Sequence, residues 1–108
     1  MSYPAADYPV NILLVNGVLK VVPDRAHASW SKRNSVVWHC VGCRAEVVFE
    51  RGSPFVSDRF EVPAGGFVGS GPVVNGLVGE CFKYRVSAIE LNGGRRYDVD
   101  PEVVVDNG

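Results

Sequence analysis

The residues with the most evident chemical potential lie in one short segment, where His39 and Cys40 come just before Cys43. A Cys-x-x-Cys spacing can supply two thiolates to zinc, and His39 or the distant Cys81 could complete the ligand set. Successive residues of a strand point to opposite faces, however, so His39 and Cys40 would not reach the same ion unless a turn intervened. The sequence also lacks the second Cys-x-x-Cys or the pair of histidines that structural zinc sites usually have. We therefore prefer small buried thiols without a metal, and keep a zinc or copper site at these four residues as the alternative.

The same cysteine spacing also occurs in redox proteins, where a helix N-terminus lowers the pKa of the attacking thiol. Residues 44–49, which follow Cys43, have the pattern of a strand and offer no helix dipole. Arg44 alone would activate the thiol only weakly. A redox role is therefore a further alternative, with less support than a metal site.

A glycine-rich segment, residues 63–79, contains six glycines and two prolines. Phosphate-binding loops carry a Lys followed by Ser or Thr and lead into a helix, whereas this segment leads to a proline and a strand. We therefore predict a long surface loop. Phe67 and Val68 within it are expected to fold back onto one end of the domain, or, if exposed, to mark a surface for a partner.

The elements that must position these residues are strands. The chain of 108 residues is 46% hydrophobic and 21% charged, and it contains twenty-one valines but no threonine or glutamine. Together with 12 glycines and 7 prolines, this composition favours an all-β fold, because the stiff side chain of valine suits a pleated sheet. The length fits a single domain over residues 1–108, in which residues 1–9 form an N-terminal tail.

Turn residues divide the chain into short strands. Asn16-Gly17 predicts a tight hairpin between two apolar runs, because both residue types tolerate the positive φ of a type I′ turn. For residues 25–31 we prefer a strand to a short helix, because apolar residues alternate there. The other strands are predicted at residues 10–15, 18–22, 36–41, 45–50, 55–62, 81–91, 95–99 and 103–105. In residues 81–91 four apolar side chains share one face: Phe82, Tyr84, Val86 and Ala88.

The order of these features resembles the cupredoxin-like β-sandwich over roughly residues 12–105. The matching pieces are a Pro-Asp break, a Val-Val-Trp segment, a Val-Val-Phe strand and an aromatic-x-aromatic strand, at residues 23–24, 36–38, 47–49 and 79–84. Residues 97–105 also resemble small uncharacterised bacterial proteins of this type. The resemblance implies a Greek-key β-sandwich of about seven to eight strands.

The same resemblance argues against a blue-copper centre. Copper-binding members have a His at the position of Ala45 and a Cys at the position of Val86. No His occurs in residues 87–91, and Met1 is the only methionine. Since such a centre needs two imidazoles and a thiolate, the resemblance implies the fold without the copper.

Composition and charge also limit the partners. The formal net charge of -1 provides no bulk electrostatic attraction to nucleic acid or to an anionic membrane. The longest apolar stretches, such as residues 12–15, are far shorter than the roughly 20 residues that span a bilayer. No secretory signal is visible, and three cysteines cannot all pair with one another, so we expect a cytoplasmic protein.

No nucleophile or general base stands in a recognisable motif, so nothing in the sequence favours a particular enzymatic activity. We predict a small non-catalytic binding or interaction module without a cofactor. It would bind an unidentified protein or small molecule through loops at one end of the sandwich, chiefly residues 63–79 and 51–58. The alternative is a metal-binding or redox protein built on His39, Cys40 and Cys43.

Overall fold

The structure contains strands in each of the segments that the turn residues delimit, and it contains more strands than the sequence predicts. The computed structural model describes residues 8–31 and 35–107. These residues form eleven strands and no helix, so the described part of the chain has no helix that could cross a membrane. In chain order the strands are β1 (Tyr8–Val15), β2 (Val18–Val22), β3 (Arg25–Ser29), β4 (Val36–Val41), β5 (Cys43–Val48), β6 (Arg59–Val62), β7 (Phe67–Gly69), β8 (Cys81–Lys83), β9 (Arg85–Glu90), β10 (Arg96–Val99) and β11 (Glu102–Asp106).

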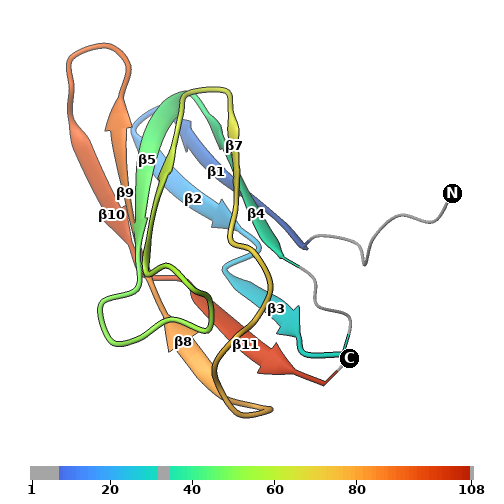
Figure 1. Ribbon diagram of the computed structural model, residues 1–108. Helices are drawn as coiled ribbons and strands as arrows, with labels where there is room; N and C mark the ends of the chain where they lie inside the picture. The colour runs from blue at the N-terminus through green and yellow to red at the C-terminus, as the bar shows by residue number, and fades with distance from the viewer. Residues whose placement is uncertain (1–7, 32–34, 108) are drawn as a thin grey trace, which may run out of the picture.

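The strands pair in three sheets (Figure 1). Sheet 1 has the order β2-β1-β4-β7, in which β1 and β4 are parallel and the other pairs antiparallel. Sheet 2 has the order β10-β9-β5-β6 and is antiparallel throughout. Sheet 3 has the order β3-β11-β8, with β3 parallel to β11, and lies at the lower end in Figure 1. Within the described ranges, none of these sheets closes into a barrel.

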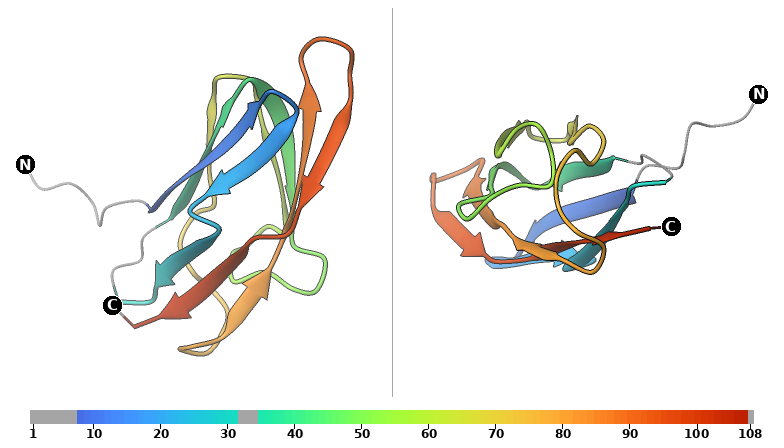
Figure 2. Two further views of the ribbon diagram at one scale, coloured as in Figure 1. Left: turned by 180° about the vertical axis from the view of Figure 1, so that it is seen from behind. Right: turned by 60° about the horizontal axis from the view of Figure 1, so that its bottom comes forward.

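Sheets 1 and 2 form two layers with the core between them, as the two views of Figure 2 show. The molecule extends 43 × 35 × 19 Å. Since packed sheets lie about 10 Å apart, the shortest dimension leaves room for two layers and not for a third. Within residues 8–31 and 35–107, therefore, no third layer covers the outer face of either sheet.

The chain passes from sheet 1 to sheet 2 at a single residue, Gly42, which separates β4 from β5. Gly42 has a φ of +80°, and a Cβ at this position would lie 2.7 Å from the carbonyl oxygen of Leu14. Only glycine fits such a conformation and such a close approach. The crossover places Cys40 and Cys43, at the ends of the two strands, on either side of the turn.

β8–β9 and β10–β11 together form one long ribbon that belongs to two sheets. In sheet 2, Val86 of β9 lies opposite Val99 of β10. In sheet 3, Lys83 of β8 lies opposite Glu102 of β11. Lys83 lies three residues before Val86, and Glu102 lies three residues after Val99. The pairing register of the two arms, β8–β9 and β10–β11, is therefore the same in both sheets.

The ribbon is interrupted at Tyr84, whose N–H donates to the carbonyl oxygen of Pro101 at 3.0 Å. Residues 81–91, predicted as one strand, are therefore two strands that follow one another directly. The predicted inward face is confirmed, because four alternating side chains are buried: Phe82, Tyr84, Val86 and Ala88.

Five aromatic rings fill one part of the core: Trp38, Phe49, Phe55, Phe60 and Tyr84. The ring centroids of Trp38 and Phe60 lie 5.0 Å apart, and those of Phe49 and Tyr84 lie 4.9 Å apart. Such tilted and edge-on contacts are favourable beyond the area that they bury. The cluster connects β4 of sheet 1 with the loop after β5 and with the interruption of the ribbon.

Several sequence predictions need correction. The described residues form eleven strands and not seven to eight, because residues 81–91 form two strands in different sheets and β7 lies in a segment predicted as loop. Residues 63–79 are not loop throughout, since β7 lies within them and pairs with β4. Of the predicted tail at residues 1–9, residues 1–7 lie outside the described ranges, and Tyr8 already begins β1. The all-β class and the hairpin at Asn16-Gly17 are confirmed.

Candidate functional site

The two thiols nearest to one another, Cys40 and Cys43, lie in the core with no exposed surface. The Cys43 thiol donates a hydrogen bond to the carbonyl oxygen of Val41 at 3.8 Å, and the two thiols interact electrostatically with each other. Burial, and then the neighbouring Cys43, raise the pKa of Cys40 to about 12. Burial also raises the pKa of Cys43. Both thiols are therefore protonated near neutral pH, which makes them poor nucleophiles and poor metal ligands.

The other two predicted ligands lie elsewhere. His39 is on the outer face of sheet 1, as strand alternation requires, and its ring stacks on that of Phe67 with centroids 4.2 Å apart. Cys81 is exposed on β8 in sheet 3. The structure thus brings together two of the four residues. Across residues 8–31 and 35–107, no three His, Cys, Asp or Glu side chains are grouped closely enough to hold a metal ion.

The positions at which the cupredoxin resemblance expects copper ligands hold core residues. Ala45 on β5 is 7% exposed, and Val86 on the neighbouring strand β9 has no exposed surface. Neither side chain carries a ligand atom. These positions contribute to packing between the sheets.

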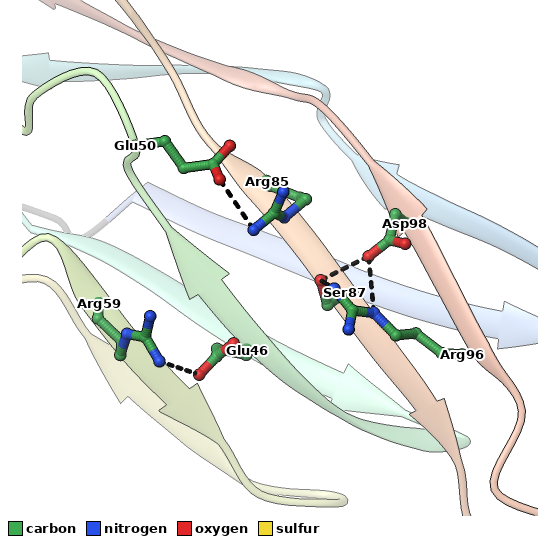
Figure 3. Close-up of polar contacts among 7 residues, drawn as sticks. All are labelled: Glu46, Glu50, Arg59, Arg85, Ser87, Arg96 and Asp98. Atoms are coloured by element: carbon green, nitrogen blue, oxygen red, sulfur yellow. Dashed lines mark hydrogen bonds and ion pairs between the residues drawn. The ribbon is translucent and has the colours of Figure 1, made fainter.

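The outer face of sheet 2 is covered by charged side chains that pair with one another (Figure 3). Arg59 contacts Glu46 at 2.8 Å and Arg85 contacts Glu50 at 2.9 Å. On β9 and β10, Ser87 donates to Asp98 at 2.5 Å and Arg96 contacts the same oxygen at 3.2 Å. The face consists of Arg44, Glu46, Val48, Arg59, Glu61, Arg85, Ser87, Ile89, Arg96 and Asp98.

The hydrogen bond from Ser87, followed by Arg96, lowers the pKa of Asp98. Asp98 is therefore ionised over the whole neutral range and is already held by its neighbours. A polar outer face of this kind is expected for an antiparallel sheet with one solvated side.

The outer face of sheet 1 is different, because it is mostly apolar. We call it the apolar face, and it consists of Pro9, Asn11, Leu13, Val15, Val18, Lys20, Val22, Val37, His39, Val41 and Phe67. The pairing places these side chains in register across the four strands, with Leu13 between Lys20 and Val41. Among the described residues of this face, Lys20 alone carries a full charge at neutral pH.

The exposure of the apolar face is large. Val15 is 57% exposed, Val18 is 52% exposed and Phe67 is 66% exposed. Single exposed apolar residues are ordinary, whereas a contiguous group on one sheet marks an interaction site. The sequence of β1 also indicates this surface. The continuous apolar run at residues 12–15 of β1 is typical of a strand that is covered on both faces.

The two loops predicted to form the binding end do meet. The N–H of Val74, in the glycine-rich segment, donates to the carbonyl oxygen of Pro54 at 2.7 Å. Of the two residues predicted to face a partner, Phe67 is exposed on the apolar face, whereas Val68 is only partly exposed and packs against the core. Phe67 thus belongs to a sheet surface rather than to a loop.

A groove lies where β2 at the edge of sheet 1 approaches β10 at the edge of sheet 2. Its volume is about 510 Å³, within the range typical of ligand sites. It is lined by Lys20, Val21, Val22, Pro23, Asp24, Val99, Asp100 and Pro101. Lys20 and Val22 belong also to the apolar face, so the groove continues that surface around the edge of the sheet.

Comparison with known proteins gives no family for this chain. No model of a known protein family matches the sequence, and no curated protein sequence matches it either.

Proposed function

We propose that this protein is a non-catalytic module that binds another protein through the apolar face of sheet 1. The contrast between the two outer faces carries the proposal. Seven of the ten outer residues of sheet 2 are charged and largely paired, whereas Lys20 is the one charged residue among the eleven of the apolar face. In a domain of two layers, an apolar outer surface gains stability only when another molecule covers it.

The shape of the apolar face supports a protein partner. Four strands about 4.8 Å apart make a broad surface, and small-molecule sites are concave rather than flat. Phe67, stacked on His39, provides an aromatic side chain of a kind that is enriched at protein interfaces. The stack also holds both rings in place before binding, which reduces the entropy lost on association.

Site-specific photocrosslinking tests the proposal. The photoreactive residue p-benzoyl-phenylalanine is placed at Val15 or Val41 on the apolar face, and at Arg44 or Glu61 on the outer face of sheet 2 as matched controls. Irradiation of cells that produce these variants should give discrete protein adducts from the first pair and none from the second. The absence of adducts from Val15 and Val41, or equal adducts from both faces, would contradict the proposed function.

Two further assignments remain proposals. We propose a cupredoxin-like Greek-key arrangement without copper, supported by the order of the sequence features over residues 12–105.

We also propose a cytoplasmic location, with which the free thiols of Cys40, Cys43 and Cys81 are compatible. The alternative of a metal-binding or redox protein has less support, because the two adjacent thiols are buried and protonated.

A further inference from the structure

The groove beside the apolar face has the features of a pocket for one side chain. Val22 and Val99 provide apolar walls from β2 and β10, and Pro23 and Pro101 follow them where the two strands leave their sheets. Within the described residues, β2 pairs only with β1, and β10 pairs only with β9. The groove therefore lies between two edge strands, neither of which pairs with a further described strand.

The groove has one basic and two acidic side chains. Lys20 lines it from β2, and Asp24 lines it from the bend that follows the end of β2 at Val22. Asp100 lines the same groove from the other wall. Asp24 and Asp100 also line a second hollow of about 270 Å³, together with Arg25, Lys83 and Glu102.

The basic side chains around this carboxylate pair are already engaged. Arg25 contacts Glu102 at 2.5 Å, and Lys83 contacts the same carboxylate at 3.6 Å. In the described part of the chain, neither Asp24 nor Asp100 takes part in an ion pair or in a side-chain hydrogen bond. Arg25 and Lys83 share the one carboxylate of Glu102, so this region keeps one negative charge in excess that an incoming cation can neutralise.

We propose that the groove binds a lysine or arginine side chain of the protein that covers the apolar face. The inference rests on the proposed function, because the groove is continuous with that face through Lys20 and Val22. The aliphatic part of the side chain lies against Val22 and Val99, and its cationic end lies at Asp24 and Asp100. The groove makes binding specific for a partner with a basic side chain, whereas the apolar face contributes hydrophobic binding energy that does not depend on charge.

Binding of blocked amino acids to the full chain, followed by backbone amide NMR, tests the groove directly. The probes are the N-acetyl, N-methylamide derivatives of lysine, norleucine and glutamate, which compare a cationic, a neutral and an anionic side chain. We expect millimolar binding of the lysine derivative, with shifts concentrated at residues 20–24 and 99–101. Norleucine should bind at least about fivefold more weakly, and glutamate should not bind. Added salt should weaken only the lysine derivative.

The double variant Asp24→Asn, Asp100→Asn should reduce lysine binding to the level of norleucine. Asp58→Asn, an exposed carboxylate in the loop after β5, is the matched control and should leave binding unchanged. Equal binding of lysine and norleucine, binding of glutamate, or shifts outside the groove would overturn the inference. Tenfold tighter binding of n-butylammonium than of blocked lysine would assign the groove to a small amine and would overturn it too.

A second variant separates the groove from the apolar face. Val15→Ser, Val41→Ser changes that face and leaves every residue of the groove in place. This variant should bind blocked lysine as the unmodified chain does, even if crosslinking shows that nothing docks on the apolar face. If the unmodified chain still gives crosslinked adducts but binds blocked lysine no better than norleucine, only the groove proposal is wrong. If the chain binds blocked lysine but gives no adducts, the proposed function is wrong, and the bound side chain does not come from a protein on the apolar face.

Discussion

The indole N–H of Trp38 donates a hydrogen bond to the hydroxyl oxygen of Tyr84 at 3.2 Å, inside the core. Trp38 comes from β4 in sheet 1, and Tyr84 is the residue at which the long ribbon passes from sheet 3 to sheet 2. Burial raises the pKa of Tyr84 to about 12, so its hydroxyl remains neutral and available as an acceptor. One buried polar contact therefore joins the layers where the ribbon is interrupted.

Tyr84→Phe should lower the free energy of unfolding by about 1–2 kcal/mol, because the buried N–H of Trp38 loses its acceptor. Urea unfolding of both proteins measures the difference. Tyr97→Phe is the control, since the hydroxyl of Tyr97 donates to Glu90 at a partly exposed site where water can replace it. A loss for Tyr84→Phe no larger than that for Tyr97→Phe would show that the buried contact adds little.

Phe67→Ala and Val68→Ala should separate binding from stability. Val68 packs against the core, and its truncation should cost about 1–2 kcal/mol of unfolding free energy. Phe67 is exposed, and its truncation should cost less than about 1 kcal/mol, chiefly through its contact with His39. Only Phe67→Ala should reduce crosslinking from Val41 while the protein stays fully folded. Thermal unfolding and crosslink yield are the two measurements, and a large thermal loss for Phe67→Ala would contradict its place on the apolar face.

The thiols should differ in reactivity. With a disulfide reagent at pH 8, Cys81 should react rapidly because it is exposed, whereas Cys40 and Cys43 should react only as the core opens. All three should react at once in denaturant. Cys81→Ser should abolish the rapid phase, and two rapid thiols in the native chain would place Cys40 or Cys43 at the surface.

Alkaline pH should destabilise the fold from about pH 9 upward. The ordinary pKa of a cysteine is 9.0, and that of Cys40 in the folded chain is about 12. Between these values the unfolded chain loses a proton that the folded chain retains, so the stabilisation is complete below pH 9 and is lost as the pH rises toward 12. The limiting slope for one thiol is about 1.4 kcal/mol per pH unit.

Urea unfolding between pH 8 and pH 10 measures this slope before Tyr84 adds its own contribution above its ordinary pKa of 10.0. Cys40→Ala should reduce the slope, and the part that remains belongs to Cys43, whose pKa is also raised. Cys81→Ala is the matched control and should leave the slope unchanged. An identical slope in the Cys40 and Cys81 variants would mean that Cys40 is not buried in the folded protein.

Sequence patterns predicted the local elements well where a local rule applies. Asn16-Gly17 forms the expected hairpin because its turn geometry depends on those two residues alone. The alternation of Phe82, Tyr84, Val86 and Ala88 fixes one buried face because a slip by one residue would expose all four. These features need no knowledge of distant contacts.

Features that depend on distant pairing were missed. β7 has three residues, with Gly69 among them, and exists because Phe67 and Gly69 lie opposite His39 and Val37 of β4. No local preference predicts such a strand. For the site, alternation correctly separated His39 from Cys40, whereas the position of Cys81 in sheet 3 depends on pairing with Val104 of β11. The apolar run at residues 12–15 of β1 indicated two apolar faces, but periodicity does not say whether the second face is covered within the chain.

The unbroken register of the long ribbon restricts how this protein can change in length during evolution. An insertion or deletion of one residue in either arm would turn the following side chains over, in sheet 2 and in sheet 3 together. It would also move Tyr84 away from Pro101. Insertions and deletions in the ribbon are therefore tolerated at the hairpin tip, residues 91–95. Elsewhere they are tolerated only when both arms of the ribbon gain or lose the same number of residues. A lineage of related sequences should show gaps at that tip and paired gaps elsewhere along the ribbon.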